Sequence, residues 1–156
     1  MKFLNADKYQ PACNKLYLQY QSKVSKLLPE ARIEHIGASS VPGAISKGDL
    51  DIFVGVEAPE LEKSVEILKT LGFQEKLGTL RTPELCMLES KTEDVAFQVV
   101  ANGSEFEDFL IFRDRLRANS ELLKQYNELK RSCEGLSHED YRSRKSVFVE
   151  QVLSKS

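Results

Sequence analysis

Two different periods of apolar residues alternate along the first half of the chain. Apolar side chains recur every three or four positions from about residue 7 to 28, which predicts an amphipathic helix that Pro29 ends. The same helical spacing returns over 59–73. Between these helices, segments 31–37 and 49–56 are short and rich in β-forming residues, so each predicts a strand.

Two more β-prone runs lie in the middle of the chain, and the pattern after them is helical. The runs 84–90 and 94–101 are separated by the polar stretch 91–93, which predicts a hairpin. After Gly103 the spacing predicts helices. Side chains suited to cap them are Asn119 or Ser120 for one helix and Ser137 for another. This order predicts an α/β (α+β) fold with a small mixed sheet flanked by helices and a C-terminal helical segment.

Length and charge narrow the classes of protein to consider. A chain of 156 residues with 41% hydrophobic residues is expected to form one domain, 1–156, around one core. The net charge of −2 argues against general nucleic-acid binding, which needs a surplus of Lys and Arg, but allows a small phosphate-bearing ligand. The first twenty residues hold no continuous apolar stretch, so we expect no signal peptide, no membrane span and a cytoplasmic location.

The cysteines and histidines argue against two kinds of site. Cys13, Cys86 and Cys133 are odd in number and far apart, which disfavours a disulfide framework and a zinc site. His35 and His138 are also distant in sequence and have no third histidine to join them. Small buried residues in a reducing compartment are the favoured interpretation for the cysteines.

The candidate chemistry lies in "EHIGASSVPGAISKGDLDIFV", residues 34–54. In a strand, Asp49 and Asp51 point to the same side, with Cα atoms roughly 7 Å apart, so both carboxylates can reach one hard cation. Mg²⁺ is the natural candidate, with Mn²⁺ as the alternative, and it would join the aspartates to the phosphates of a nucleotide. A solvated strand end is the simpler explanation for the same pair.

Residues upstream of the aspartates favour an anion nearby. Gly37 lets the backbone approach a ligand closely, and Ser39 and Ser40 offer hydroxyl and backbone N–H groups. Lys47 lies two residues before Asp49, and two interpretations stay open for it: a cation facing the ligand, or an exposed loop lysine.

These motifs resemble those of a known family. "HIGASSVPGAISKGDLDI" is similar to the GrpB family, and the likeness extends to "FLIFRDRLRANSELLKQYNELKR" and "YRSRKSVFVEQVL". The first of these segments also resembles the signature of the DNA polymerase β-like nucleotidyltransferase superfamily. Ile36, Gly37 and the Asp49–Asp51 pair match that signature, whereas Ala38 stands where it has Gly or Ser. The resemblance implies a nucleotidyltransferase-like core.

The same resemblance implies a third carboxylate on a later strand, which completes the metal site and activates the attacking hydroxyl. The matching strand is "DVAFQVVA", where Gln98 stands at the expected position. A neutral amide is a poor base and a weak metal ligand. Asp94 would replace it only if the strand were shifted by about four residues.

Two cations of the C-terminal helices match further GrpB-like elements. Arg113 lies in a match to F-R-D-x-L-R, and Lys145 lies in a match to Y-x-x-x-K. The resemblance favours a phosphate-binding role for both, facing the aspartates. An ion pair between Arg113 and a nearby acid such as Asp114 is the simpler alternative.

Two functions of different class follow. The first is a metal-dependent nucleotidyltransferase that moves a nucleotidyl group from a nucleoside triphosphate to an acceptor. The second is an accessory protein of the same fold that binds a nucleotide or phosphorylated metabolite without turnover. In both cases the expected partner is a small phosphorylated molecule.

Overall fold

The computed structural model describes residues 2–154, which form one five-stranded sheet and five α-helices. In chain order the helices and strands are α1 (Ala6–Leu27), β1 (Arg32–Ile36), β2 (Leu50–Val56), α2 (Leu61–Lys69), β3 (Phe73–Glu75), β4 (Leu85–Ser90), β5 (Val95–Ala101), α3 (Asp108–Ala118), α4 (Ser120–Ser132) and α5 (His138–Ser154). Short 3-10 helices occupy Ala38–Ser40, Ala58–Glu60 and Glu105–Glu107. The expected α/β fold with a C-terminal helical segment is confirmed.

The sheet is mixed, as predicted. Its strands lie in the order β1–β2–β5–β4–β3. Only the central pair, β2 and β5, is parallel, and the other three pairs are antiparallel. The two longest strands, each of seven residues, therefore form the centre of the sheet, where both faces are covered.

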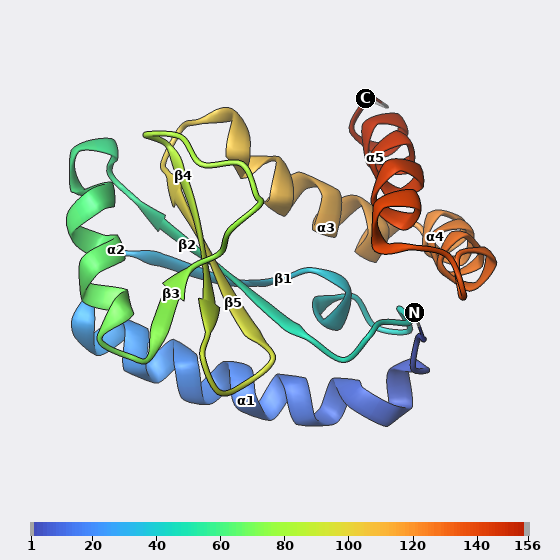
Figure 1. The fold of residues 1–156 in the computed structure, drawn as a ribbon, viewed down its shortest axis with the longest axis horizontal. Coiled ribbons are helices and arrows are strands. Elements are labelled where there is room, and N and C mark those ends of the chain that lie inside the picture. Colours follow the sequence, from blue (N-terminus) through green and yellow to red (C-terminus); the bar gives the residue numbers. More distant parts are fainter. Residues whose placement is uncertain (1, 155–156) are drawn as a thin grey trace.

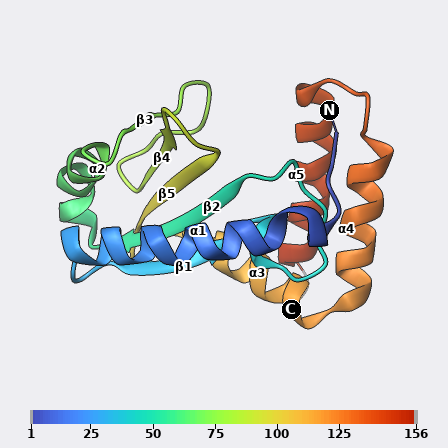
Figure 2. The ribbon, with the colours of Figure 1, turned by 90° about the horizontal axis from the view of Figure 1, so that it is seen from below.

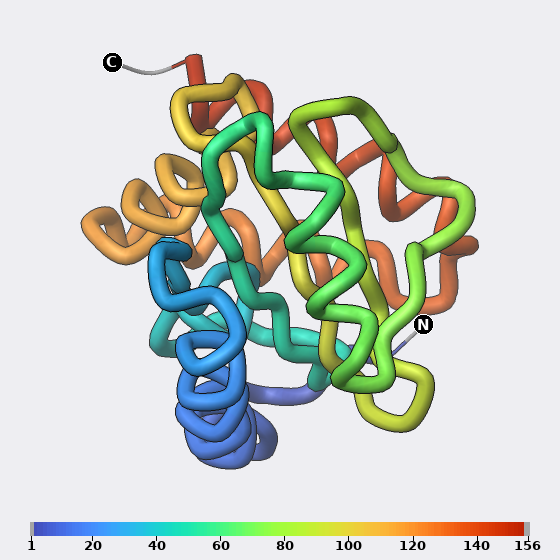
Figure 3. Tube along the Cα trace, turned by 90° about the vertical axis from the view of Figure 1, so that its left-hand side faces the viewer, coloured from blue at the N-terminus to red at the C-terminus, as the bar shows by residue number. Residues whose placement is uncertain are grey.

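One face of the sheet is covered by α1 and α2. Leu50, Ile52 and Val54 of β2 point to this face and are fully buried against apolar residues of both helices. Figure 2 shows α1 lying along the sheet, and Figure 3 shows α2 nearest to the viewer, with α4 and α5 behind it. This face is a closed apolar core and leaves no room for a ligand.

The other face carries Asp51 and Phe53, which alternate with those core residues. Phe53 packs with Leu110 of α3, so α3 covers part of this face. The strand β2 begins at the end of the sheet nearer to α4 and α5 and runs away from them (Figure 1). The aspartates therefore lie at the end of the sheet that faces the C-terminal helices.

Most predicted elements are found where the pattern placed them. The 84–101 hairpin is formed by β4 and β5. The Asn119 side chain caps α4 by accepting hydrogen bonds from the backbone N–H groups of Glu121 and Leu122, and Ser137 Oγ accepts one from Asp140 N at 3.1 Å. The short strand β3 was not predicted. Across residues 2–154, every helix is too short or too polar to span a bilayer.

Candidate functional site

Asp49 and Asp51 are held at the start of β2 by a tight turn. Gly48 takes a φ of +101°, a conformation that favours glycine, and its N–H donates to Ser46 Oγ at 3.1 Å. Ser46 Oγ in turn donates to Asp49 Oδ1 at 3.2 Å. Since Ser46 is buried, this chain of hydrogen bonds fixes Asp49 beside the strand end and leaves its second oxygen for a ligand.

Both aspartates line a polar cavity of about 340 Å³ at this end of the sheet. The cavity is bounded by β2, β5, the end of β4 and the residue after β3. Its charged residues are Lys47, Asp49, Asp51, Lys76, Glu89, Glu93 and Asp94. Lys47 lines the cavity and is also exposed, so both interpretations of this lysine stay open.

Gly37 leaves room for the Asp51 carboxylate. A Cβ atom at Gly37 would lie 2.5 Å from Asp51 Oδ2, and the φ of Gly37 is +74°. The glycine of the turn after β1 is thus required both by backbone conformation and by the close approach of Asp51. Gly37, in the turn after β1, and Asp51, on β2, therefore lie in direct contact.

We expect Gly37→Ala to destabilise the protein more than Gly72→Ala does. Gly72 has a similar φ of +90° but no atom within 4 Å of an added Cβ, so its variant should lose only about 1–2 kcal/mol from backbone strain. Gly37→Ala should lose a further 1–3 kcal/mol, roughly, from the clash with Asp51. Urea unfolding of both variants measures the difference. Equal losses would show that Asp51 moves away freely.

The environment of Asp51 opposes its negative charge. Burial, and then the neighbouring charge of Asp49, raise the pKa of Asp51 from 3.8 to about 6. Lys145, Lys76 and Lys130 act in the opposite direction. A cation between the two carboxylates would remove this repulsion, so the donor set and its electrostatics fit a hard divalent metal such as Mg²⁺.

Lys130 is a buried lysine of α4 that lies near enough to the aspartates for their charges to act on it. Only 2% of the residue is exposed, its Nζ donates to the Ile45 carbonyl oxygen at 2.6 Å, and it lies 4.1 Å from the centre of the Tyr126 ring. Burial, followed by the charge of Lys145, lowers the pKa of Lys130 to about 7, while Asp49 and Asp51 act in the opposite direction. Lys145, half-buried on α5, thus belongs to the same electrostatic cluster.

The position beside Asp51 on β5 holds Ala96. The register pairs Asp51 with Ala96 and Phe53 with Gln98, so Gln98 lies on the same face of the sheet as Asp51, two residues beyond the position directly beside it. Gln98 Oε1 is buried without a hydrogen-bond partner. Within residues 2–154, no three His, Cys, Asp or Glu side chains converge closely enough to hold a metal ion.

The two serines of the turn are buried, and their hydroxyl groups are engaged. Ser40 Oγ donates to the Gly37 carbonyl oxygen at 2.6 Å, and Ser39 Oγ lies 2.7 Å from His35 Nε2. Burial, together with the charges of two arginines, lowers the pKa of His35 to about 4, so the ring is neutral at pH 7. These contacts hold the turn in place, and the Ser40 hydroxyl already donates within the turn.

Arg113 lies in an ion-pair network rather than at the cavity. Its guanidinium donates to Glu34 Oε1 at 2.9 Å, to Asp114 Oδ1 at 2.9 Å and to the His35 carbonyl oxygen at 3.0 Å. The alternative pairing with Asp114 is therefore present. Because β1 and α3 are joined by this network, Arg113 positions the turn that follows β1.

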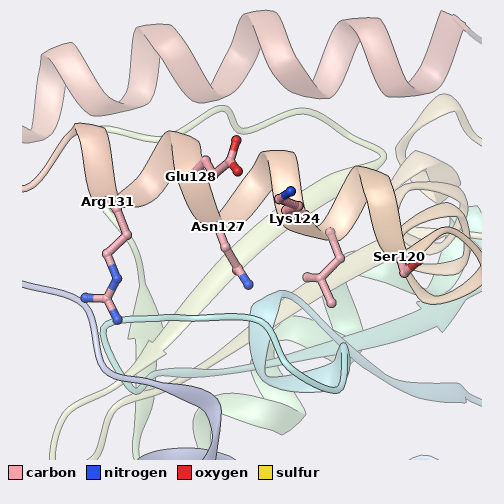
Figure 4. A pocket seen from close by; sticks show the side chains of 6 residues that line it. Ser120, Lys124, Asn127, Glu128 and Arg131 are labelled. Atoms are coloured by element: carbon pink, nitrogen blue, oxygen red, sulfur yellow. The ribbon is translucent and has the colours of Figure 1, made fainter.

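A second hollow, of about 450 Å³, lies along α4, on a side where Asn127 and Arg131 bond the loop before β2 and the N-terminal segment. Figure 4 shows its lining side chains, among them Ser120, Lys124, Asn127 and Arg131. All six lining residues come from α4. The hollow lacks the paired carboxylates and buried lysine of the first cavity, so it is a weaker candidate for chemistry.

Comparison with known proteins agrees with the family resemblance of the segment that holds the aspartates. A model of the GrpB protein family matches residues 5–155. The chain belongs to the GrpB family. It is 62% identical over 157 residues to a UPF0157 protein of Vibrio cholerae, an alignment that covers all of this chain and 84% of the relative. The glutamate-rich protein GrpB of Alkalihalophilus pseudofirmus is 29% identical over 134 residues, covering 79% of this chain and 77% of the relative.

Solved structures show the fold of this GrpB-family member. The GrpB protein of Enterococcus faecalis superimposes with a TM-score of 0.80 at 22% identity, covering 97% of this chain and 94% of that one. The Cid1 poly(U) polymerase, solved with MgGTP bound, superimposes with a TM-score of 0.56 at 13% identity, covering 82% of this chain and 43% of the polymerase. The fold is nucleotidyltransferase-like.

Sequence reasoning missed two residues of the site in this GrpB-family chain. Lys130 lies in the charged run "LKRS", which is typical of an exposed helix face, and only the packing of α4 against Ile45 reveals its burial. Glu89 is the second residue from the end of β4, and only the register brings it to the aspartates' side of the sheet.

Proposed function

We propose that the protein is a metal-dependent nucleotidyltransferase whose site is the cavity at the start of β2. The observation that carries the proposal is the pair of mutually repelling carboxylates, Asp49 and Asp51, with Asp51 fitted against Gly37. A metal ion bound between the two carboxylates would relieve that repulsion. The fold shared with Cid1, which was solved with MgGTP, supports this assignment.

In this proposal the acidic residues of the site bind the metal ion and the basic residues bind the phosphates. Asp49 and Asp51 would hold Mg²⁺ or Mn²⁺, which supplies charge neutralisation at the phosphates of a nucleoside triphosphate. Lys47 at the cavity, with Lys130 and Lys145 from the C-terminal helices, would neutralise the remaining phosphate charge. Ser39 and Ser40 shape the turn, and Arg113 keeps that turn in place.

A second candidate function is an accessory protein that binds the nucleotide without turning it over. The neutral residues Ala96 and Gln98 on the Asp51 face of β5 favour this alternative, because a transferase of this superfamily is expected to carry a third carboxylate on this strand. Both candidates predict the same ligand, so binding and turnover have to be measured separately.

Calorimetric titration with ATP, GTP, CTP and UTP, each with Mg²⁺ and with EDTA, tests the binding step. We expect at least one nucleotide to bind with Mg²⁺ and to lose that affinity in EDTA, because the aspartates repel phosphates without a cation. Release of pyrophosphate on adding a crude metabolite extract as acceptor separates transferase from accessory protein. Metal-independent binding of all four nucleotides would contradict both.

A further inference from the structure

We propose that Asn127 of α4 is a positioning residue, which orients the carboxylate of Asp49 through the backbone of the loop before β2, residues 41–48. The inference rests on the proposed function and deepens it. It gives the C-terminal helical segment a part in metal binding that is separate from the charge of its lysines. Asn127 reaches the carboxylate through two intervening residues, Ile45 and Ser46.

The Asn127 side chain uses both of its polar ends on this loop. Its Oδ1 accepts a hydrogen bond from Ile45 N at 3.0 Å, and its Nδ2 donates one to the Gly43 carbonyl oxygen at 3.0 Å. Figure 4 shows this side chain pointing from α4 toward the loop. A carboxamide supplies one acceptor and one donor group at this length, which neither an aliphatic side chain nor a carboxylate does.

The backbone that Asn127 holds is joined to Asp49 by a short series of contacts. The peptide groups on both sides of Ile45 are bonded to α4, since the Ile45 carbonyl oxygen accepts from Lys130 Nζ at 2.6 Å. The next residue, Ser46, is buried, and its Oγ donates to Asp49 Oδ1 at 3.2 Å. A shift of the Ile45 backbone would therefore move the hydroxyl that orients the Asp49 carboxylate.

The loop has other anchors, so it should stay folded without the Asn127 contacts. From α1, Gln10 Nε2 donates to the Val41 carbonyl oxygen at 2.7 Å. Ser46 pairs with Leu4 through backbone hydrogen bonds of 2.6 and 3.1 Å. Asn127 adds the orientation of the segment between these anchors, and groups that orient a metal ligand affect metal affinity strongly.

Binding of Mn²⁺ alone, followed by electron paramagnetic resonance of the free ion, tests the assignment on the full chain. Asn127→Leu keeps the size of the side chain and removes both hydrogen bonds, so the Mn²⁺ affinity should fall about tenfold. Asn127→Ala should give the same loss without the bulk of leucine. Gln10→Leu is the matched control and should weaken binding less, because Gln10 is also a half-buried amide but bonds the loop further from Asp49.

A double-variant cycle distinguishes positioning from a general weakening of the fold. Ser46→Ala removes the hydroxyl between the loop and Asp49, and should itself weaken Mn²⁺ binding about tenfold. In that background Asn127→Leu should cause little further loss, because the contact through which Asn127 acts is already missing. Urea unfolding of the same preparations shows whether each variant is folded.

The outcomes separate the two proposals. In folded variants, an affinity unchanged by Asn127→Leu or by Ser46→Ala would overturn the role of Asn127. Equal weakening by Gln10→Leu, or losses that multiply in the double variant, would overturn it as well. If the unmodified chain binds no Mn²⁺, or if Asp51→Asn keeps its affinity, the proposed function itself fails. Loss with Asp51→Asn but not with Asn127→Leu removes only the positioning role.

Discussion

Asp51→Asn should abolish Mg²⁺-dependent nucleotide binding and yet give a metal-free protein at least as stable as the unmodified chain. The amide keeps the shape of the side chain but is a weak ligand for Mg²⁺, so the affinity for metal and nucleotide should fall a hundredfold or so. Stability should rise because the variant removes a half-buried charge that burial and Asp49 both oppose.

The size of the stability change depends on pH. The pKa of Asp51 is about 6 in the folded protein and about 3.8 without these neighbours, so the folded state holds its proton more firmly between these values. The unmodified chain therefore loses stability as pH rises from about 4 to 6, and the variant lacks this loss. At pH 8 we expect the free energy of unfolding of Asp51→Asn to exceed that of the unmodified chain by about 1–2 kcal/mol, after allowing for partial solvent screening.

Melting temperature and nucleotide affinity have to be measured on the same Asp51→Asn preparation, with Asp94→Asn as the control for loss of one charge at the cavity. A variant that is less stable but binds nucleotide as before would show that Asp51 has a structural role and would remove the metal site.

Lys130→Met should abolish a pH-dependent rise in stability and weaken nucleotide binding. The pKa of Lys130 is about 7 in the folded protein and 10.5 ordinarily, so between these values the unfolded chain binds more protons than the folded one. The unfolding free energy of the unmodified chain should therefore increase by about 2 kcal/mol from pH 7 to pH 9 through this residue. Methionine fills the same space and does not titrate.

Urea unfolding at pH 7 and pH 9 checks this result. Lys124→Met is the matched control, because Lys124 lies on the same helix but is exposed. The groups whose charges act on Lys130 are Lys145, Lys47, Asp49 and Asp51, and they are unchanged in both variants. The same pH dependence in Lys130→Met and Lys124→Met would show that Lys130 is charged and well solvated in the fold.

The sequence predicted the parts of this fold that depend on local pattern. The spacing of apolar residues predicted both helices on the closed face of the sheet, and the polar stretch 91–93 predicted the β4–β5 hairpin. Strand β3 was missed because Phe73 follows Gly72 at once and continues the apolar spacing of α2, while Gln74 and Glu75 are polar. A three-residue strand has too few positions for a period of two to be recognised.

The site was predicted only where its residues are close in sequence. Gly37, Asp49 and Asp51 belong to one motif; the fold brings Gly37 against Asp51, and both aspartates line one cavity. Which residue of β5 lies beside Asp51 depends on the register of β5, which long-range packing sets and a single strand does not encode. The pairing of Arg113 with Glu34 joins residues 79 positions apart, so the sequence left its role open.

The most direct test of the central claim is the position of Mn²⁺ in crystals grown with the nucleoside triphosphate that binds best, located by its anomalous scattering. The account predicts a peak within coordination distance of Asp49 and Asp51, with the triphosphate on the side of Lys130 and Lys145. A nucleotide bound elsewhere, with no Mn²⁺ between the aspartates, would contradict it.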